Sequence, residues 1–258
     1  MKGKVAFITG AGSGIGKATA FLFAQQGLNV SLLSRSEEEL DEVVTEIRSN
    51  GGESFCVTGD ISEPDEVRQA IEQTVNRWGR LDVVFANAGI NGVWAPLDEL
   101  EVDEWDKTVS INIRGTFLTV KYAIPHMKQN GGSVIITSSI NGTRVFSNSG
   151  ATAYSCTKAA QVAFTKMTAV ELGKYRIRVN AICPGLIETE IMENTTMRNI
   201  EKARVPVEYP EGDIPLTRGK GGTSQQVAQL AWFLASDASS HITGTEVYID
   251  GAQSLLRG

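Results

Sequence analysis

A glycine-rich run near the start of the chain constrains the fold more than any other feature. Residues 4–9 are a short apolar stretch, and Gly10, Gly14 and Gly16 follow before apolar residues recur at helical spacing over residues 14–26. Glycine lets the backbone turn tightly and approach a ligand closely, and the unpaired N–H groups at a helix N-terminus attract phosphate. The run predicts a strand, a turn and a helix that together bind a nucleotide. An ordinary connecting turn is the alternative.

The composition narrows the classes of function. The 258 residues carry a net charge of -6 with both signs interspersed, so no basic stripe is present for nucleic acid or an anionic membrane. There is no run of about 18 apolar residues, and the first apolar run is too short for a signal peptide. We expect a cytoplasmic protein without nucleic-acid or membrane partners. No linker or repeat divides the chain, which predicts one domain over residues 1–258.

The cysteines and histidines indicate no metal site. Cys56, Cys156 and Cys183 are scattered and lack CxxC spacing, which argues against a disulfide framework and a zinc site. His126 and His241 lie far apart in unlike contexts, so we interpret each as a satisfied or exposed side chain and not as a ligand.

Strand-like and helix-like segments alternate along the chain. Seven strands are predicted, at residues 4–9, 29–34, 53–58, 81–86, 133–137, 177–183 and 246–249. Helices are predicted at residues 14–26, 64–78, 103–127, 153–174 and 223–235, with another that begins at Ser36. Alternation with nearly continuous apolar strands is typical of an α/β fold: a doubly wound, mostly parallel seven-stranded sheet with helices on both faces.

Tyr154 and Lys158 are the first candidates for chemistry. Four residues apart in one predicted helix, they lie on the same face and would share one pocket. An ammonium close to a phenol favours the phenolate, which predicts that the tyrosine pKa falls from about 10 toward working pH. The pair would then serve as an acid and a base. A chance pairing on a solvated helix face is the alternative.

The ends of two predicted strands carry further candidates. Residues 133–137 lead to Ser138 and Ser139, at the strand end where catalytic groups of α/β proteins gather. The strand over residues 81–86 leads to Asn87, Ala88 and Gly89, whose small size leaves room for a cofactor in the crevice of an open sheet.

The end of the second strand bears on the choice of cofactor. A carboxylate there would bind the adenosine ribose, but Ser34 occupies the position and Arg35 follows it. A guanidinium would pair with a 2′-phosphate, so these residues predict NADP(H) over NAD(H). The alternative is that Arg35 merely flanks the helix that begins at Ser36, whose capping box extends to Glu39.

Taken together, the motifs resemble the short-chain dehydrogenase/reductase family, single-domain Rossmann-type enzymes that use NAD(H) or NADP(H), and within it the branch similar to bacterial 3-oxoacyl-ACP reductases. The resemblance covers almost the whole chain and rests on TGAGSGIG at residues 9–16, Asp60, ANAG at 86–89, Asn112, Ser139, YSCTK at 154–158 and CPG at 183–185. Ser13 breaks the TGxxGxxG pattern of the larger epimerase-like branch, and enoyl reductases space the Tyr and Lys more widely. Ala86 departs mildly from the Asn that the family usually has there.

The resemblance implies reversible hydride transfer between a nicotinamide and a carbonyl or secondary alcohol. Tyr154 would be the general acid and base, Ser139 would orient the substrate oxygen, Lys158 would lower the tyrosine pKa and hold the ribose, and Asn112 would hold a water of a proton relay. The cofactor residues implied are Gly10, Ser13, Gly14, Ile15, Gly16, Ser34, Arg35, Asp60, Ile61, Asn87, Ala88, Gly89, Tyr154, Lys158, Pro184, Gly185, Ile187 and Thr189. For Asp60 the alternative is helix capping, and for Asn112 it is a solvent-facing or locally bonded side chain.

A long segment of weak periodicity, residues 190–222, is interpreted as a substrate lid with a short helix near residues 194–204. Its cations either attract an anionic substrate or face solvent; they are Arg198, Lys202 and Arg204. Three apolar residues are candidates for pocket walls or for plain core packing: Trp94, Phe146 and Met192.

The substrate class and the assembly stay open at this point. A 3-oxoacyl thioester, a sugar, a steroid or a simple ketone would each fit the reaction, and fold-level analogy does not decide among them. The segment ITGTEVYIDGA at residues 242–252 resembles one that packs between subunits, which implies a homotetramer or homodimer. A nucleotide-binding redox sensor or scaffold without turnover is the main alternative function, and a lyase or isomerase without net cofactor redox is another.

Overall fold

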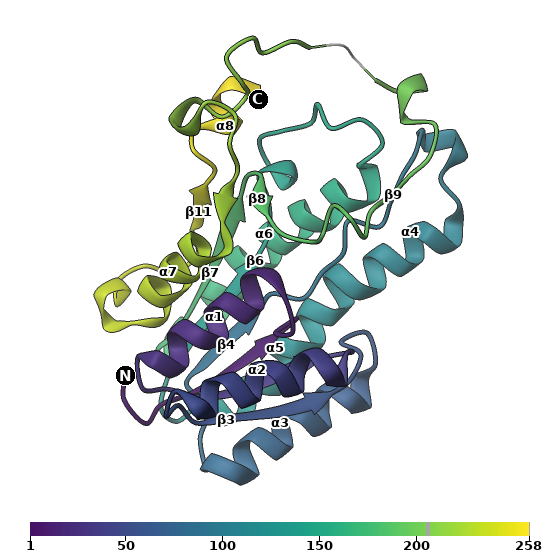
Figure 1. The fold of residues 1–258 in the computed structure, drawn as a ribbon. Coiled ribbons are helices and arrows are strands. Elements are labelled where there is room, and N and C mark those ends of the chain that lie inside the picture. The colour runs from purple at the N-terminus through teal and green to yellow at the C-terminus, as the bar shows by residue number, and fades with distance from the viewer. Residues whose placement is uncertain (205–206, 258) are drawn as a thin grey trace.

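A seven-stranded sheet forms the centre of the molecule (Figure 1). The structure is a computed structural model that describes residues 1–204 and 207–257. The strands are β1 (Val5–Thr9), β2 (Asn29–Ser34), β3 (Ser54–Thr58), β4 (Val83–Ala86), β6 (Gly132–Thr137), β7 (Ile177–Pro184) and β11 (Glu246–Ile249). They lie in the order β11-β7-β6-β4-β1-β2-β3, and each neighbouring pair is parallel. The predicted doubly wound sheet is confirmed.

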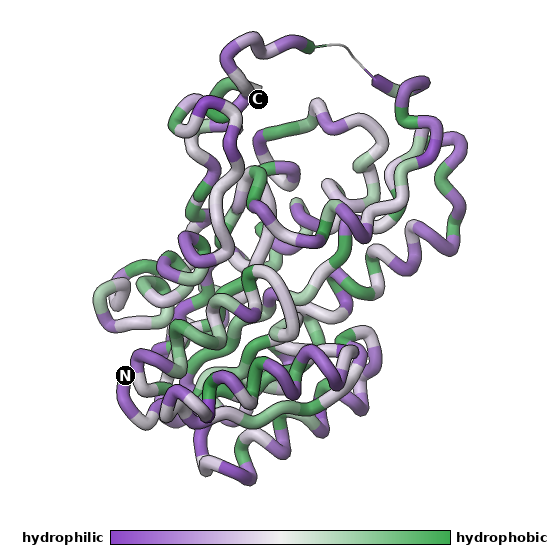
Figure 2. Tube along the Cα trace, viewed as in Figure 1, coloured by the Kyte–Doolittle hydropathy of each residue, from purple (hydrophilic) through white to green (hydrophobic). Residues whose placement is uncertain are grey.

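Helices cover both faces of this sheet. One layer holds α1 (Gly14–Gln25), α2 (Glu37–Ser49) and α7 (Ser224–Ala235), and the other holds α3 (Pro64–Trp78), α5 (Gly115–Met127) and α6 (Thr152–Leu172). Side chains alternate along each strand, so β1 contributes Ala6 and Ile8 to one core and Val5 and Phe7 to the other. Figure 2 shows hydrophobic residues concentrated in the strands, while α2 and α3 alternate between hydrophilic and hydrophobic along their length.

Side chains cap the starts of two helices, and the first of these caps is the one predicted at Ser36. Ser36 Oγ accepts a hydrogen bond from the Glu39 N–H at 3.3 Å, which begins α2. A reciprocal capping box between Thr223 and Gln226 begins α7. Both caps fix where a helix leaves the sheet edge.

The predicted helix over residues 103–127 is not regular. It consists of α4 (Val102–Val109), a π-helical segment at Ser110–Arg114, and α5. A π-helical turn inserts extra chain into the helix and is often found at functional sites. Asn112 lies in this wider turn, so the irregularity coincides with a candidate site residue.

The short helix predicted near residues 194–204 is wrong. That stretch holds the two-residue strand β9 (Thr196–Met197), which pairs with β5 (Val93–Trp94), and a 3₁₀ turn at Ile200–Lys202. Asn199 separates them in the left-handed conformation, with φ of 49°, which an α-helix does not allow. Residues 205–206 of the predicted lid lie outside the described residues.

The later part of the predicted lid pairs with the segment that follows β7. The two-residue strand β10 (Gly222–Thr223) pairs with β8 (Ile187–Glu188), and α8 (Gln253–Arg257) packs beside this segment. No helix among the described residues combines the length and the apolar character that crossing a membrane requires.

Candidate active site

A single large cleft runs along the C-terminal ends of the strands. Its volume is about 900 Å³, within the range of small-molecule sites. It extends from Ser34 and Arg35 at the end of β2, past the glycine turn, to Ser139 and Tyr154. Seventeen of the eighteen implied cofactor residues line the cleft together with Ser139, so the resemblance predicted one continuous surface. They are Gly10, Ser13, Gly14, Ile15, Ser34, Arg35, Asp60, Ile61, Asn87, Ala88, Gly89, Tyr154, Lys158, Pro184, Gly185, Ile187 and Thr189.

The glycine turn has the shape of a phosphate cradle. Gly10 and Gly14 have φ angles of 63° and 50°, which residues with a side chain adopt rarely. The first turn of α1 carries no acidic residue, so no carboxylate of that turn opposes an anion at the helix N-terminus. These features fit the pyrophosphate of a dinucleotide.

Gly16 does not reach the cleft wall. A Cβ atom there would lie 2.8 Å from the Gly10 carbonyl carbon and 2.9 Å from Asn87 Nδ2. Gly16 therefore allows α1 to pack tightly against the turn, and its contribution to a cofactor site is indirect.

Asn87 connects the turn to the centre of the sheet. Its Nδ2 donates to the Thr9 carbonyl at 3.2 Å, and its Oδ1 accepts from Thr137 Oγ1 at 3.0 Å. Thr9 Oγ1 in turn accepts from the Asn87 and Ala88 N–H groups at 3.0 and 3.1 Å. Bonds across β1, β4 and β6 hold the cleft floor in one conformation.

Asp60 caps the turn before α3 and not the helix itself, whose N-cap is Glu63, and its implied contact with adenine stays a prediction. Its Oδ1 accepts from the Ser62 N–H at 2.8 Å and from Ser62 Oγ at 2.7 Å, as a turn-capping aspartate does. The residue also lines the cleft beside Ile61. Capping orients the carboxylate and does not exclude a contact with a ligand.

Ser138 and Ser139 are separated clearly by the structure. Ser138 is 2% exposed, and its Oγ donates to the Lys158 carbonyl at 2.8 Å, which ties β6 to α6. Ser139 Oγ accepts from the Asn141 N–H at 3.2 Å and shares a hydrogen bond with Tyr154. Ser139 is therefore the serine that lies beside the phenol.

Lys158 is held in the wall of the cleft. Its side chain is nearly buried at 4% exposure, and Nζ donates to the Thr137 carbonyl at 2.9 Å. Burial lowers the pKa of Lys158 to about 8, because removing water penalises the ammonium. Nζ lies 5.4 Å from the Tyr154 ring centroid, so the charge contacts the ring as a cation–π pair.

The expected fall in the Tyr154 pKa is not found. Burial raises the pKa of Tyr154 because the phenolate loses water, and the hydrogen bond with Ser139 opposes this only in part. The Lys158 ammonium does not reverse this rise in the pKa of Tyr154, because Nζ donates to the Thr137 carbonyl and contacts the face of the ring. At neutral pH Tyr154 therefore holds its proton, the state that an acid requires.

Asn112 lies behind the cleft wall and is fully buried. Its Oδ1 accepts from the Ile90 N–H at 2.9 Å, and its Nδ2 donates to the Ile90 carbonyl at 2.9 Å and to Thr157 Oγ1 at 3.0 Å. A Cβ on Gly89 would lie 3.1 Å from Asn112 Oδ1 and 3.5 Å from Lys158 Nζ. The side chain thus ties the π-helical turn to the loop after β4 and to α6.

Three threonines of the site were missed by sequence reasoning. Thr137 receives Lys158 Nζ, Thr157 joins Asn112 to α6, and Thr9 holds the Asn87 and Ala88 backbone. Thr157 precedes Lys158 inside the YSCTK motif, and Thr9 and Thr137 each end a strand. Position at a strand end was an available signal, but the partners lie far away in sequence.

The end of the cleft that the resemblance assigns to the nicotinamide is supported by the C-terminal segment. The Leu186 N–H donates to Gln253 Oε1 at 2.9 Å, and a Cβ on Gly185 would lie 2.6 Å from that oxygen. Thr189 approaches the glycine turn, since a Cβ on Gly14 would lie 3.4 Å from its Cγ2. The two ends of the predicted dinucleotide site therefore close over the same cleft.

Two of the three candidate pocket walls line the cleft. Trp94 and Met192 line the cleft, whereas Phe146 is 72% exposed and does not line it. Phe146 is therefore not a pocket wall.

Known proteins match this chain over nearly its full length. A model of the family described as Enoyl-(Acyl carrier protein) reductase matches residues 10–252. The 3-oxoacyl-(acyl-carrier-protein) reductase FabG of Thermotoga maritima is 40% identical over 97% of this chain and 98% of its own. The crystal structure of a 3-ketoacyl-ACP reductase from Sinorhizobium meliloti is 52% identical, with a TM-score of 0.96 over 98% of this chain and 100% of that one.

A further solved structure bears on the cofactor. The 3-ketoacyl-(acyl-carrier-protein) reductase of Brucella melitensis, complexed with NADH, is 31% identical, with a TM-score of 0.86 over 98% of this chain and 99% of that chain. The glycine turn, the strand order and these matches lead to one conclusion: the chain belongs to the short-chain dehydrogenase/reductase family, whose members are oxidoreductases that use a nicotinamide cofactor.

Proposed function

We propose that the protein transfers a hydride reversibly between the nicotinamide of NAD(P)(H) and a carbonyl or secondary alcohol carbon, with Tyr154 as general acid and base. The observation that carries the proposal is the meeting of Ser139, Tyr154 and Lys158 on one wall of a cleft that also contains the glycine turn. A protein that only binds nucleotide has no use for this set.

Each residue has a distinct part in the reducing direction. The bound cofactor supplies the hydride. Tyr154 donates its proton to the substrate oxygen, and Ser139 orients that oxygen by a hydrogen bond. Lys158 lies close enough to the ring to stabilise the phenolate left behind.

Other residues of the cleft would position the cofactor. Gly10, Ser13, Gly14 and Ile15 would hold the pyrophosphate at the N-terminus of α1. Asp60 and Ile61 would contact the adenine, and the turn from Pro184 to Thr189 would hold the carboxamide. Asn112 would act through Lys158 as part of a proton relay; its buried hydrogen bonds to Ile90 and Thr157 support a positioning role.

The test is cofactor oxidation by the purified protein across a panel of ketones and 3-oxoacyl thioesters, with NADPH and with NADH. Tyr154→Phe should lower turnover by about 10²- to 10⁴-fold, the usual contribution of general acid catalysis, and should keep cofactor affinity. Tyr175→Phe is the matched control because Tyr175 does not line the cleft. Equal turnover in Tyr154→Phe would refute the role.

The outcome also separates the alternatives. Tight cofactor binding without turnover on any substrate would favour a redox sensor or scaffold. Substrate conversion without net change in the cofactor would favour a lyase or isomerase.

We further propose that NADP(H) is preferred over NAD(H). Arg35 is exposed at the cleft edge, and the neighbouring Ser34 brings no carboxylate to the ribose position. Glu39 acts in the opposite sense: its carboxylate lies against Gly12 and lines the same end of the cleft. Arg35 thus attracts a 2′-phosphate, and Glu39 limits how strongly it binds.

Titration of both cofactors tests this preference. Arg35→Ala should weaken NADPH binding about tenfold, as expected for a lost charged hydrogen bond, and leave NADH binding unchanged. Glu39→Gln should tighten NADPH binding. Equal affinities for the two cofactors that do not respond to Arg35→Ala would refute the preference.

A homotetramer or homodimer is the proposed assembly. Met167 and Val170 on α6 are 74% and 86% exposed, and such apolar side chains on a helix face suit burial between subunits. Sedimentation equilibrium that gives a monomer of 27.8 kDa would exclude it.

A further inference from the structure

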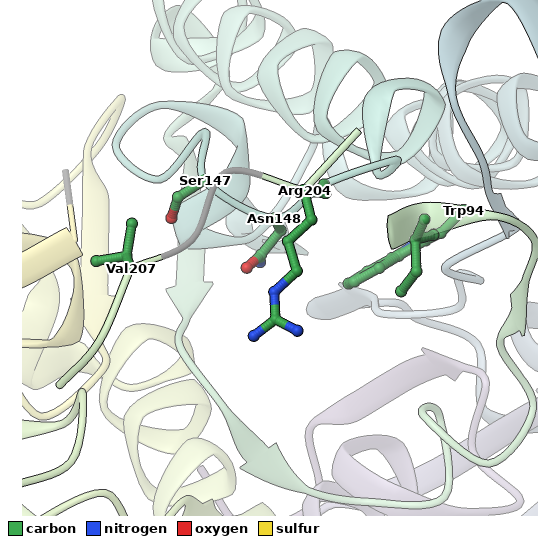
Figure 3. A pocket seen from close by; sticks show the side chains of 7 residues that line it. Trp94, Ser147, Asn148, Arg204 and Val207 are labelled. Carbon is green, nitrogen blue, oxygen red and sulfur yellow. The ribbon is translucent and has the colours of Figure 1, made fainter. Parts of the chain in front are cut away.

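A smaller chamber opens beside the cleft and is not used by the proposed chemistry. Its volume is about 200 Å³, and its walls are Trp94, Ser147, Asn148, Ser149, Ile200, Arg204 and Val207 (Figure 3). Trp94 and Asn148 also line the large cleft, together with Ser139 and Tyr154. The chamber therefore adjoins the place where a substrate carbonyl would lie.

Hydrogen-bond donors without partners gather in this chamber. Within the described part of the chain, Trp94 Nε1 and Ser147 Oγ are buried and have no hydrogen-bond partner. An indole N–H can only donate, and a buried donor without an acceptor is unfavourable. Two such groups lining one cavity indicate that a ligand supplies the acceptor atoms.

A cation lines the same chamber. Figure 3 shows the Arg204 guanidinium extending between Trp94 on one side and Val207 on the other. No residue in the described lining is acidic, and Arg204 forms no ion pair with any described residue. Its charge is thus open to an external anion.

The two nearby cations behave differently. Arg198 forms a bidentate pair with the Glu104 carboxylate, both contacts at 2.8 Å, and Lys202 pairs with Glu99 at 2.6 Å. These pairs fasten the preceding segment to α4 and the turn before it. The segment is held in place, while Arg204 at its end has no ion-pair partner among the described residues.

We propose that this chamber binds an oxyanion of the substrate, a carboxylate or a phosphate, at the end remote from the reacting carbon. The inference rests on the proposed function, because the chamber opens beside the cleft in which the carbonyl would react. Arg204 supplies the charge and a planar fork of donors that matches either anion, and Trp94 Nε1 and Ser147 Oγ complete the set. The volume suits such a group with a few attached carbons. The substrate class is therefore an anionic oxo or hydroxy compound.

Matched substrates test the proposal kinetically. The panel is a series of oxo carboxylates of increasing length, their methyl esters and the corresponding oxoalkyl phosphates. The wild-type protein should have a lower KM for at least one anion than for its ester. The anion with the lower KM shows whether the chamber takes a carboxylate or a phosphate. Arg204→Ala should raise that KM at least tenfold, with kcat and the ester KM nearly unchanged, and Arg204→Lys should restore part of the loss.

Lys202→Ala is the matched control. It removes the same charge two residues away, but that charge is already paired with Glu99, so the ratio of anion to ester KM should not change. If Arg204→Ala and Lys202→Ala weakened the preference for the anion over the ester equally, the effect would be general charge attraction, and the proposal would be overturned.

A binding measurement separates this inference from the proposed function. The chain has four tryptophans, and Trp94→Phe identifies the Trp94 indole signal in a ¹⁵N NMR spectrum of the full-length protein. Glutarate and inorganic phosphate are the probes. At least one should shift that signal in the wild-type protein and not in Arg204→Ala.

The two hypotheses can then fail separately. Reduction of neutral ketones with no anion preference and no indole shift would overturn the chamber and leave the proposed function intact. An Arg204-dependent shift in a protein that turns over no carbonyl compound would support the anion site and refute the proposed function. A shift of equal size in Arg204→Ala would overturn the inference.

Discussion

The buried wall of the cleft and the exposed segment that faces it are built in opposite ways. Asn112 is fully buried and Lys158 nearly so, and the polar atoms of both side chains bond within the chain. Across the cleft, Arg198 and Lys202 lie at the surface in ion pairs, and Arg204 is unpaired among the described residues. The groups proposed for the chemistry are thus held in place independently of substrate, whereas those proposed to select the substrate lie where a substitution costs little stability. Four experiments can break or sharpen this contrast.

The largest effect is expected at Asn112. Asn112→Leu would leave the Ile90 N–H and the Ile90 carbonyl without their partner, and the Thr157 hydroxyl would keep only its bond to the Tyr154 carbonyl. Each unsatisfied group costs about 1–3 kcal/mol, so the free energy of unfolding should fall by roughly 3 kcal/mol or more, with loss of most turnover. Urea unfolding and steady-state kinetics measure both.

Asn194→Leu is the control in the opposite region. The Asn194 side chain is exposed and donates only to the Glu190 carbonyl four residues before it, so stability and kcat should hardly change. Equal losses in the two variants would remove the distinction between the regions.

The burial of Lys158 predicts a pH dependence of stability. Its pKa is about 8 in the fold against 10.5 ordinarily, so between these values the unfolded chain binds more protons than the native protein. The free energy of unfolding contributed by Lys158 should therefore rise with pH across this window, by up to about 3 kcal/mol. Lys158→Met should lack this rise. Unfolding without cofactor at pH 7.5 and pH 10 checks it, and parallel pH profiles would contradict it.

The two serines at the end of β6 should separate catalysis from structure. Ser139→Ala should lower kcat about 100-fold with little change in stability, as expected when an oriented donor to the reacting oxygen is lost. Ser138→Ala should cost about 1 kcal/mol of stability by releasing the Lys158 carbonyl, and should keep much more of the turnover. The reverse pattern would exchange their roles.

The smallest effect on stability is expected at Arg198. Its ion pair with Glu104 is partly exposed, and pairs of this kind contribute little to global stability. Arg198→Ala should therefore leave the thermal midpoint nearly unchanged but speed thermolysin cleavage within residues 190–204. Arg68→Ala, which breaks an exposed pair with Asp65 on α3, should do neither. A large fall in the midpoint of Arg198→Ala would show that this segment belongs to the cooperative core.

The sequence predicted the sheet well because its signals are local. The central strands β1, β4 and β6 are apolar runs buried on both faces, and the strand ends are marked by glycine, by small polar residues or by a helix cap. The glycine turn is likewise local, since the φ angles of Gly10 and Gly14 depend on their own lack of a side chain. The motif order then indicated which strand ends meet in the cleft.

What failed depended on partners distant in the chain. The segment after residue 190 is not a helix because β9 pairs with β5 about a hundred residues earlier, and spacing alone cannot show that pairing. For the same reason Arg198, Lys202 and Arg204 were indistinguishable until Glu99 and Glu104 were located. The Tyr154 pKa was predicted in the wrong direction because the motif gave the Lys158 charge but not the loss of water.

The strand order also bears on how the chain can be assembled during translation. From β1 outward, each new strand adds to an edge already made, first β2 and β3 on one side, then β4, β6, β7 and β11 on the other. No strand has to be inserted between two that are already paired. Protease protection of ribosome-stalled chains of increasing length would reveal such stepwise growth. The half of the cleft that contains the glycine turn could then form on a nascent chain before the ribosome has added Tyr154.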